Sequence, residues 1–453
     1  MSKKVVHVVG AGLAGSEAAY FLAERGIHVF LHEMRPAKTT PAHKTAGFAE
    51  LVCSNSFKSQ APDSAPGILK SEMSRMGSLI LRMAALAAVP GGEALAVDRD
   101  QFSEGVTCAL KSHPFIEFVS GEVKGPFEDG VTLIATGPLT SDALSKWLGH
   151  ATGANDLYFY DAIAPIIDAT TIDPENSFLA NRYGKGEVEA YLNCPMTEEQ
   201  YYVFIDALMA AEKVPPKGFE KENFFQGCQP IEAIASTGRE SLRFGPMKPV
   251  GLDNPKTGKR AYAVVQLRPE NLARTAYNMV GFQTKLKYGE QARVFKLIPA
   301  LRNAEFLRMG SIHRNTYVCG PKVLRPDLSL KGHPRVYLAG QVSGVEGYLE
   351  SAACGLLAAS FIDQRLNGQP HHAPGANTGM GALLRHITGG NPDSYQPSNI
   401  HFGLFEANYF DESATLKRDE LRKKIASLTI ENFSRWWDTQ QSKSHPVEKQ
   451  NAL

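Results

Sequence analysis

The first part of the chain has two short apolar runs separated by a helical pattern. Residues 5–9 (VVHVV) form the first run, and residues 27–32 (IHVFLH) form the second, which is followed by Glu33. A glycine-rich turn that begins at Gly10 stands between the first run and the helical pattern. Short apolar runs bounded by turn residues predict strands, and the 3.6-residue repeat predicts a helix. This stretch is therefore predicted to be a βαβ unit.

The same order of elements returns late in the chain. Residues 335–338 (RVYL) resemble a strand, residues 340–347 hold three glycines, and residues 350–360 (ESAACGLLAAS) have the small-residue pattern of a packed helix. This second unit begins some 330 residues after the first, too far for one compact βαβ pair. The arrangement resembles two-part flavoproteins, whose nucleotide-binding domain is split. The alternative is an ordinary turn between a strand and a helix.

The residues between these units predict further elements. A helical pattern covers residues 66–88, and Asp98 or Asp100 is expected to cap the next helix. Strand-like runs follow at 116–119 and 131–135, and the second ends in Ala-Thr-Gly, which is typical of FAD-binding sheets.

The segment from about residue 155 to 310 has a different composition, rich in Tyr, Phe and Asn with several Pro and Gly breaks. We therefore predict an α/β protein with a Rossmann-like FAD-binding domain built from N- and C-terminal segments and an inserted α+β domain. The expected divisions are 1–154 and 311–440 for the FAD-binding domain, 155–310 for the insertion, and 441–453 for a tail.

The glycine turn explains how a dinucleotide would bind. Gly10 permits a tight turn, Gly12 allows the backbone to approach a pyrophosphate, and Gly15 allows close packing of helix on strand. Glu33 lies where an acid accepts hydrogen bonds from the adenosine ribose. The turn alone suits FAD or NAD, and the second glycine turn favours FAD. The expected cofactor-binding residues are Gly10, Ala11, Gly12, Leu13, Ala14, Gly15, Glu33, Gly137, Gly340, Gly344, Glu346 and Gly347.

Composition narrows the class of protein. The 453 residues are 43% hydrophobic and 21% charged, and the longest apolar stretch, residues 76–89, contains Arg82 and is too short to span a bilayer. No cleavable apolar leader precedes the first strand, so we expect a cytoplasmic protein without a membrane partner. The six cysteines include no CxxC pair, which argues against a metal site and favours reduced thiols.

Charge is unevenly distributed although the net charge is only +1. Residues 239–331 hold 18 Lys and Arg against 6 Asp and Glu, so this segment carries +12 and the rest carries −11. Such segregation indicates contact with nucleic acid or another polyanion. The alternative is a solvated basic surface without a ligand.

Two cysteines have polar sequence neighbours. Cys53 lies within FAELVCSNSFK and Cys228 within FFQGCQPIE, and neither stretch is an apolar stripe. A working thiol needs a cation or a helix N-terminus to favour the thiolate, and Lys58, Arg239 and Arg243 are candidates by sequence proximity. A structural role for either cysteine stays open on this reasoning.

These motifs together resemble one family. The GAGLAGSEAA turn, EMRP after the second strand, LVCSNSF around Cys53, GCQPIE around Cys228 and AGQVSGVEGY at 339–348 resemble the folate- and FAD-dependent tRNA (uracil-5-)-methyltransferases of the TrmFO type. The resemblance runs from residue 2 to about 440. It implies transfer of a one-carbon unit from methylenetetrahydrofolate to C5 of the T-loop uridine of tRNA, forming 5-methyluridine. NAD(P)H would reduce the FAD, which would act as reductant and methylene relay.

The resemblance also implies roles for single residues. Cys228 is the expected nucleophile at uracil C6 and Cys53 the acid/base or flavin-side thiol, and the opposite assignment stays open. Glu346 and Tyr348 would lie near the flavin or serve in packing. The basic segment would contact tRNA phosphates, and candidates for stacking on the exposed base are Phe224, Phe225, Tyr262 and Tyr277.

Three other functions fit parts of this pattern. An NAD(P)H-dependent flavin oxidoreductase would explain the glycine turns alone. The related flavoprotein that modifies wobble uridines shares the GAGLAG and ATG motifs. A tRNA-binding flavoprotein without methyl transfer would show the same binding residues.

Overall fold

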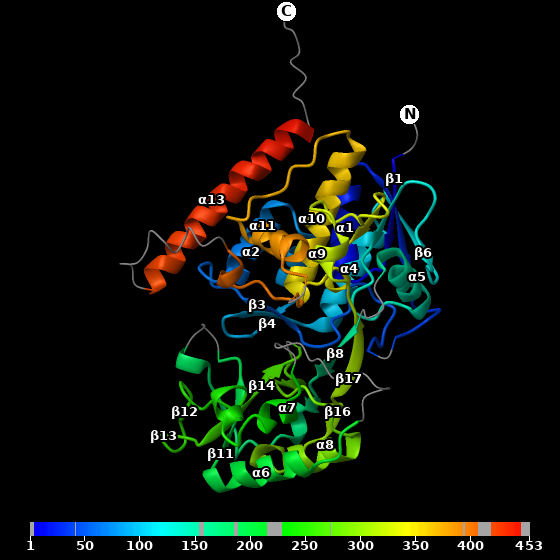
Figure 1. Ribbon diagram of the computed structural model, residues 1–453. Coiled ribbons are helices and arrows are strands. Elements are labelled where there is room, and N and C mark those ends of the chain that lie inside the picture. The colour runs from blue at the N-terminus through cyan, green and yellow to red at the C-terminus, as the bar shows by residue number, and fades with distance from the viewer. Residues whose placement is uncertain are drawn as a thin grey trace, which may run out of the picture.

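The structure is a computed structural model that describes residues 4–40, 42–153, 158–184, 189–214, 229–271, 273–392, 395–405 and 418–444. It has two lobes, shown one above the other in Figure 1. We call residues 4–153 and 317–444 the parallel-sheet lobe and residues 164–310 the antiparallel-sheet lobe. Two cores of buried apolar residues correspond to these lobes.

A five-stranded parallel sheet with the order β18-β7-β1-β2-β6 lies at the centre of the first lobe. The first βαβ unit supplies β1 and β2, so the strand, helix and strand predicted at the start of the chain are confirmed. The late strand β18 pairs with β7, which places the two distant glycine turns in one sheet. The strands are β1 (Val5–Val9), β2 (His28–Glu33), β6 (Ile116–Ser120), β7 (Val131–Ile134) and β18 (Val336–Leu338).

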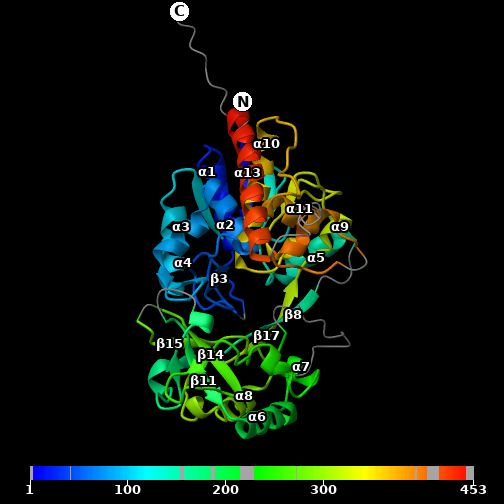
Figure 2. The same cartoon turned by 90° about the vertical axis from the view of Figure 1, so that its left-hand side faces the viewer.

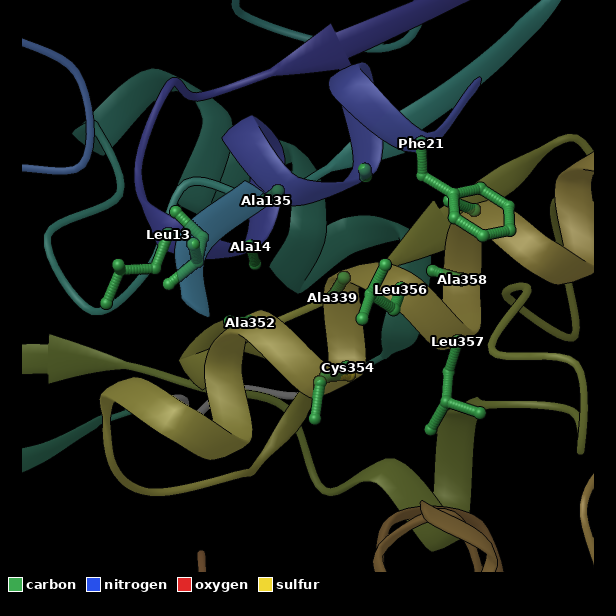
Figure 3. Packing of buried hydrophobic residues seen from close by; sticks show 14 of the residues in the cluster. Leu13, Ala14, Phe21, Ala135, Ala339, Ala352, Cys354, Leu356, Leu357 and Ala358 are labelled. Carbon is green, nitrogen blue, oxygen red and sulfur yellow. The ribbon is translucent and has the colours of Figure 1, made fainter. Parts of the chain in front are cut away.

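Helices α1 (Leu13–Ala23) and α10 (Tyr348–Leu366) join the two segments of this lobe. Figure 3 shows Ala14 and Phe21 of α1 on the side that faces α10. The backbones approach so closely that a Cβ on Gly355 would lie 2.3 Å from the Ala14 carbonyl oxygen. Both helices are buried nearly all round because each is covered by the sheet and by other helices.

The helical pattern predicted over residues 66–88 is wrong as a single helix. The chain forms α2 (Ala65–Arg75) and α3 (Leu79–Leu86), because Gly77 takes a φ of +81° and Ser78 caps α3. The buried carboxylate of Glu17 accepts hydrogen bonds from the amides of Leu79 and Ile80, which satisfies the start of α3.

The predicted cap of the next helix is confirmed. Asp98 accepts hydrogen bonds from the amides of Asp100 and Gln101 at the start of α4 (Arg99–Lys111). A small sheet with the order β3-β5-β4, which the sequence pattern did not predict, contacts α2, α3 and α10. The remaining elements of this lobe are β3 (Ser56–Ser59), β4 (Ala88–Val89), β5 (Ala94–Val97), α5 (Asp142–Thr152), α9 (Gly320–Val323), α11 (Gly379–Gly389) and the long α13 (Arg418–Ser444).

The second lobe is built on an antiparallel sheet with the order β10-β11-β14-β15-β9-β16, whose strands differ in length. One face packs on α6 and α8, which Figures 1 and 2 show on the side away from the parallel-sheet lobe. The other face is turned toward that lobe. The elements are β9 (Ile166–Asp168), β10 (Phe178–Leu179), β11 (Leu192–Met196), α6 (Glu198–Ala210), α7 (Ile231–Ser236), β12 (Asp253–Asn254), β13 (Lys259–Arg260), β14 (Ala263–Pro269), β15 (Ala276–Met279), α8 (Tyr288–Phe295) and β16 (Phe306–Arg308).

A two-stranded antiparallel ribbon joins the lobes. It consists of β8 (Tyr158–Ile163) and β17 (Ser311–Thr316), one entering and one leaving the antiparallel-sheet lobe (Figure 1). The domain limits expected at 154/155 and 310/311 lie next to these strands and stay a prediction. Within the described ranges, no helix combines the length and apolar character needed to cross a bilayer.

Candidate nucleotide and thiol site

The first glycine turn has the geometry of a phosphate-binding turn. Gly10 has a φ of +102°, which favours glycine, and a Cβ on Gly15 would lie 1.8 Å from the Gly10 carbonyl oxygen. At Gly12 a Cβ would meet no atom within 4 Å, so the backbone here faces open space. Gly12 also precedes α1 without any side-chain cap, which leaves the helix N-terminus able to meet an anion.

A cavity lies beside this turn at the carboxyl ends of β1, β2 and β7. Its walls include residues from all three strand ends, as a nucleotide site in an open parallel sheet requires. The fit to a dinucleotide therefore rests on the open backbone at Gly12 and on this cavity. The lining residues include Val9, Gly10, Gly12, His32, Glu33, Arg35, His43, Thr136 and Thr140.

Glu33 lines this cavity but is also tied to the turn. Its carboxylate accepts hydrogen bonds from the Ala11 amide at 3.0 Å and from the Arg35 amide and Nε, both at 3.1 Å. Burial opposes ionisation, yet the hydrogen bonds and charge of Arg35 keep the pKa of Glu33 below its ordinary value. Glu33 is thus an ionised residue whose hydrogen bonds link the first glycine turn to the loop after β2. Its contact with a ribose stays a prediction.

The later glycines also lie near this region. Gly137 follows β7, while Gly340, Gly344 and Gly347 stand between β18 and α10, and all four have positive φ. A Cβ on Gly340 would lie 2.9 Å from the Cβ of Ala14, so the second turn packs directly on α1. The two turns are therefore neighbours, as a split nucleotide domain requires.

The other expected cofactor-binding residues are buried near these turns. Leu13 and Ala14 are buried in the first turn of α1, and Glu346 is buried where its carboxylate accepts a hydrogen bond from Gln341.

The Cys53 loop is attached to the second turn by Tyr348. The Tyr348 hydroxyl accepts hydrogen bonds from the amides of Cys53 at 2.6 Å and Ser54 at 3.1 Å. Burial, followed by the nearby Cys53, raises the pKa of Tyr348. Tyr348, the first residue of α10, therefore stays a neutral phenol that holds the backbone of the thiol-bearing loop.

Arg99 and Glu270 hold the same loop from the other side. Arg99 donates to the carbonyl oxygens of Leu51 and Cys53, the latter at 3.4 Å. It also pairs through Nε and Nη2 with the buried carboxylate of Glu270, which follows β14 in the antiparallel-sheet lobe. The Cys53 loop is thus held by residues of both lobes.

A second pair of contacts crosses between the lobes next to this one. The fully buried amide of Asn55 donates to the carbonyl oxygens of Val97 at 3.0 Å and Pro269 at 2.9 Å. In return, Arg268 Nε donates to Asn55 Oδ1 at 2.8 Å. Residues 268–270 therefore dock directly onto the loop that carries Cys53.

The cations near Cys53 differ from those expected. Arg99 and Arg308 both interact electrostatically with Cys53, and both line an open groove between the lobes. Lys58, the expected neighbour, instead binds Glu350 at 2.5 Å and Asn399 at 2.6 Å. The groove is also lined by Leu51, Ile166, Glu270 and Ala276.

The other two expected cations also have different roles. Arg239 pairs with Asp206 at 2.7 Å, and Arg243 pairs with Glu240 while its guanidinium lies 3.5 Å from the ring centre of Tyr262. Cys228, for which they were candidates, lies outside the described residues. Its role as a nucleophile stays a prediction.

In the folded protein, part of the positive charge of residues 239–331 is neutralised by acidic residues from elsewhere in the chain. Acidic residues from outside it neutralise several of its cations: Asp206 pairs with Arg239, and Glu212 pairs with Lys287. The segment also spans both lobes, since its last residues follow β17. Lys248 and Lys259 make no ion pair with any residue of the described ranges.

One of the four expected stacking residues, Tyr277, is corrected, while Tyr262 stays a prediction. Tyr277 is 6% exposed and belongs to the core of the antiparallel-sheet lobe, so it cannot stack on a base there. Tyr262 is half-buried under Arg243, and its hydroxyl bonds Glu240. Phe224 and Phe225 lie outside the described residues.

Sequence reasoning missed Arg99, Glu270, Arg268 and Arg308. Their signal was weak because each stands far from Cys53 in sequence, and only Arg99 follows a recognisable helix cap. In the residues that the structure describes, no cluster of His, Cys, Asp and Glu could hold a metal ion.

A protein family and named relatives match this chain over most of its length. The family described as "Glucose inhibited division protein A" matches residues 5–370. A protein of Myxococcus xanthus, named "Methylenetetrahydrofolate--tRNA-(uracil-5-)-methyltransferase TrmFO", is 51% identical over 438 residues, covering 96% of this chain and 95% of its own. A protein of Bacillus cytotoxicus with the same name is 52% identical over 433 residues, covering 96% of this chain and 99% of its own.

A solved structure supports the fold. Aquifex aeolicus GidA aligns with a TM-score of 0.67 over 96% of this chain and 76% of its own, at 17% identity. At that identity the likeness concerns the arrangement of sheets and helices alone. It agrees with the predicted α/β class and the FAD-binding type of fold.

Proposed function

The chain belongs to the glucose-inhibited division protein A family, and from that premise we propose that it is a methylenetetrahydrofolate–tRNA (uracil-5-)-methyltransferase of the TrmFO type. The single observation that carries this proposal is identity of about half over 96% of the chain to relatives of that name. The geometry supports it, since the cavity beside Gly12 suits a dinucleotide and the Cys53 loop lies at the groove between the lobes.

The overall reaction balances with three substrates. The hydrogen on uracil C5 is replaced by a methyl group, methylenetetrahydrofolate leaves as tetrahydrofolate, and NAD(P)H with one proton becomes NAD(P)⁺. Methylenetetrahydrofolate supplies carbon at the formaldehyde level, so two electrons must be added to form a methyl group. The residues of the two glycine turns would hold FAD, which would supply those two electrons once reduced by NAD(P)H.

The chain's own residues would activate the uracil. C5 of uracil is a poor nucleophile, and addition of a thiolate at C6 gives C5 the electron density to form the new carbon–carbon bond. We assign this addition to Cys228. A base then removes the C5 proton, the S–C6 bond breaks, and the thiol is recovered.

Cys53 is proposed as the acid/base or flavin-side thiol. Arg99 and Arg308 would place positive charge beside its thiol, and Tyr348 would hold the loop backbone so that the sulfur keeps one position. The opposite assignment of the two cysteines would leave these supporting contacts unchanged.

The substrate RNA would meet the antiparallel-sheet lobe. Lys248 and Lys259 are proposed phosphate contacts, since phosphate neutralisation dominates affinity for nucleic acid. A T-loop uridine must leave its stack to meet the reacting residues, which fits a groove between two lobes rather than a flat surface. Because the substrate is tRNA, we propose a cytoplasmic location.

One experiment tests the function directly. Purified protein is incubated with NADPH, undermodified tRNA and methylenetetrahydrofolate deuterated in its methylene group, and nucleosides are measured by mass spectrometry. We expect deuterium in 5-methyluridine. NADPH oxidation without a labelled nucleoside would instead favour a plain flavin oxidoreductase, and label in a wobble nucleoside would favour the other tRNA-modifying activity.

A further inference from the structure

One buried polar group on the antiparallel sheet lacks a partner. Asn278, in β15, is 3% exposed, and its Nδ2 makes no hydrogen bond with any atom of the structure. A buried amide donor without an acceptor costs free energy, so folded proteins keep few of them. A ligand that brings an acceptor would remove this cost.

The register places Asn278 on the sheet face that is turned toward the other lobe. Its cross-strand neighbours are Arg268 on β14 and Ile166 on β9. The flanking residues Tyr277 and Met279 point the opposite way, into the core formed with α6 and α8. In Figure 1 those helices lie on the far side from the parallel-sheet lobe.

The neighbours of Asn278 connect it to the thiol loop. Arg268, directly opposite it, donates to Asn55, which stands two residues after Cys53. Ile166 and Ala276, on the same face, line the groove between the lobes. Paired residues on adjacent strands have Cα atoms roughly 5 Å apart. Asn278 is therefore next to Ile166, which lines this groove, and opposite Arg268, which holds the Cys53 loop.

Asn193, on the same sheet face, is a buried amide whose hydrogen bonds are made with residues in or next to the strands of this sheet, and it serves as a comparison for Asn278. It is fully buried, and its Nδ2 donates to the carbonyl oxygens of Ala180 and Tyr191 at 2.9 and 3.0 Å. Its Oδ1 accepts from Gln266 at 3.0 Å. Asn193 uses its amide to stabilise the sheet, whereas Asn278 keeps a donor unused.

We propose that Asn278 is a specificity-determining residue whose side-chain amide donates a hydrogen bond to a ring carbonyl of the substrate bound between the lobes. This rests on the proposed function, whose two ring substrates both carry such a cyclic-amide carbonyl: the uracil of the tRNA and the pterin of the folate. A buried donor discriminates strongly, because a ring with an amino group at that position would leave two donors facing each other. Cytosine differs from uracil in this way at C4.

The test compares Asn278→Leu and Asn278→Asp with Asn193→Leu. We expect both Asn278 variants to lose about 10- to 100-fold in kcat/KM. Asn278→Leu should keep or raise Tm because it removes an unpaired donor, whereas Asn193→Leu should lower Tm. A raised KM for tRNA alone assigns the uracil as the partner, and a raised KM for methylenetetrahydrofolate alone assigns the pterin.

Three outcomes would overturn the proposal. These are unchanged KM values for both substrates in Asn278→Leu, loss of bound flavin in that variant, or a fall in Tm equal to that of Asn193→Leu. The dissociation constants for tetrahydrofolate and for undermodified tRNA, measured without turnover, separate this inference from the proposed function. If the wild type does not methylate tRNA but Asn278→Leu still weakens one of these ligands, the site stands and the reaction is wrong.

Discussion

The first glycine turn and the Cys53 loop belong to the same lobe, yet they are held in position by different means. The turn is formed by backbone atoms and by Glu33, all within about 30 residues of sequence. The Cys53 loop is held by side chains from far away, with Tyr348 295 positions later in the chain and Glu270 in the other lobe.

This difference determines which substitutions each site tolerates. A site of backbone groups fails when a side chain intrudes, and is otherwise insensitive to side-chain chemistry. A site of distant ion pairs fails when one partner is removed, because the other is left buried and charged. It also couples the thiol to the orientation of the two lobes, which the nucleotide turn does not do.

The largest effect is expected where a side chain enters the turn. Gly15→Val would place a Cβ 1.8 Å from the Gly10 carbonyl oxygen, so α1 must move away from β1. We expect loss of bound flavin and a loss of more than about 3 kcal/mol in unfolding free energy. Flavin absorbance after gel filtration and Tm measure this. Gly12→Ala is the control, since its Cβ meets no atom within 4 Å, and it should fold normally. A Gly15→Val protein that retains as much bound flavin as the wild type would contradict the packing argument.

Removal of the proposed nucleophile should abolish chemistry without affecting the turn. Cys228→Ala is expected to reduce methyl transfer by at least about 10³-fold while flavin content stays at the wild-type level. Labelled 5-methyluridine and flavin absorbance are the measurements. Substantial turnover in this variant would reject Cys228 as the group that adds to C6.

Breaking the ion pair between the lobes should weaken only the thiol site. Glu270→Gln removes the charge that balances the partly buried Arg99, so the Cys53 loop loses part of its support. We expect kcat to fall about 10- to 100-fold with flavin retained. The rate at which iodoacetamide alkylates Cys53, followed by peptide mass spectrometry across pH, should change as well. Glu290→Gln, which alters an exposed pair with Arg293, should change neither quantity. An unaltered alkylation profile in Glu270→Gln would show that the two lobes do not control the thiol.

The paired and unpaired cations of the antiparallel-sheet lobe should differ in RNA binding. Lys248→Ala and Lys259→Ala are each expected to reduce the slope of log Kd against log salt by about 0.7–0.9, as loss of one phosphate contact does. Lys287→Ala should leave the slope unchanged because Glu212 already neutralises that lysine. Filter binding of undermodified tRNA from 50 to 300 mM salt distinguishes them. Equal slopes for all three variants would remove the phosphate-contact role from Lys248 and Lys259.

The smallest effect concerns a buried histidine beside the nucleotide cavity. Burial, and then the charge of His7, lowers the pKa of His32 to about 4. As pH falls below about 6.5 the unfolded chain takes up a proton before the folded one, so His32 contributes stability at neutral pH that is lost on acidification. His32→Gln should therefore lose about 2 °C less in Tm than the wild type between pH 7 and pH 5. Identical slopes of Tm against pH would exclude this source of acid sensitivity.

Local patterns in the sequence were sufficient for the elements whose cause is local. The βαβ unit, the second glycine turn before a small-residue helix, and the Asp98 cap follow from residues within a few positions of one another. The resemblance to one methyltransferase family also came from contiguous motifs. The single helix expected over 66–88 failed because helical periodicity does not register a left-handed Gly77 followed by a capping serine.

Only the tertiary structure decided how charges and thiols are grouped. Lys58, Arg239 and Arg243 stand near the cysteines in sequence but pair elsewhere, while Arg99 and Arg308 reach Cys53 from distant segments. The physical reason is that backbone conformation depends on neighbours along the chain, whereas electrostatic partners depend on distance in space. The sequence by itself determined the glycine turns for the dinucleotide and the class of fold. The packing of two lobes decided what surrounds the thiol, and which buried amide keeps an unpaired donor.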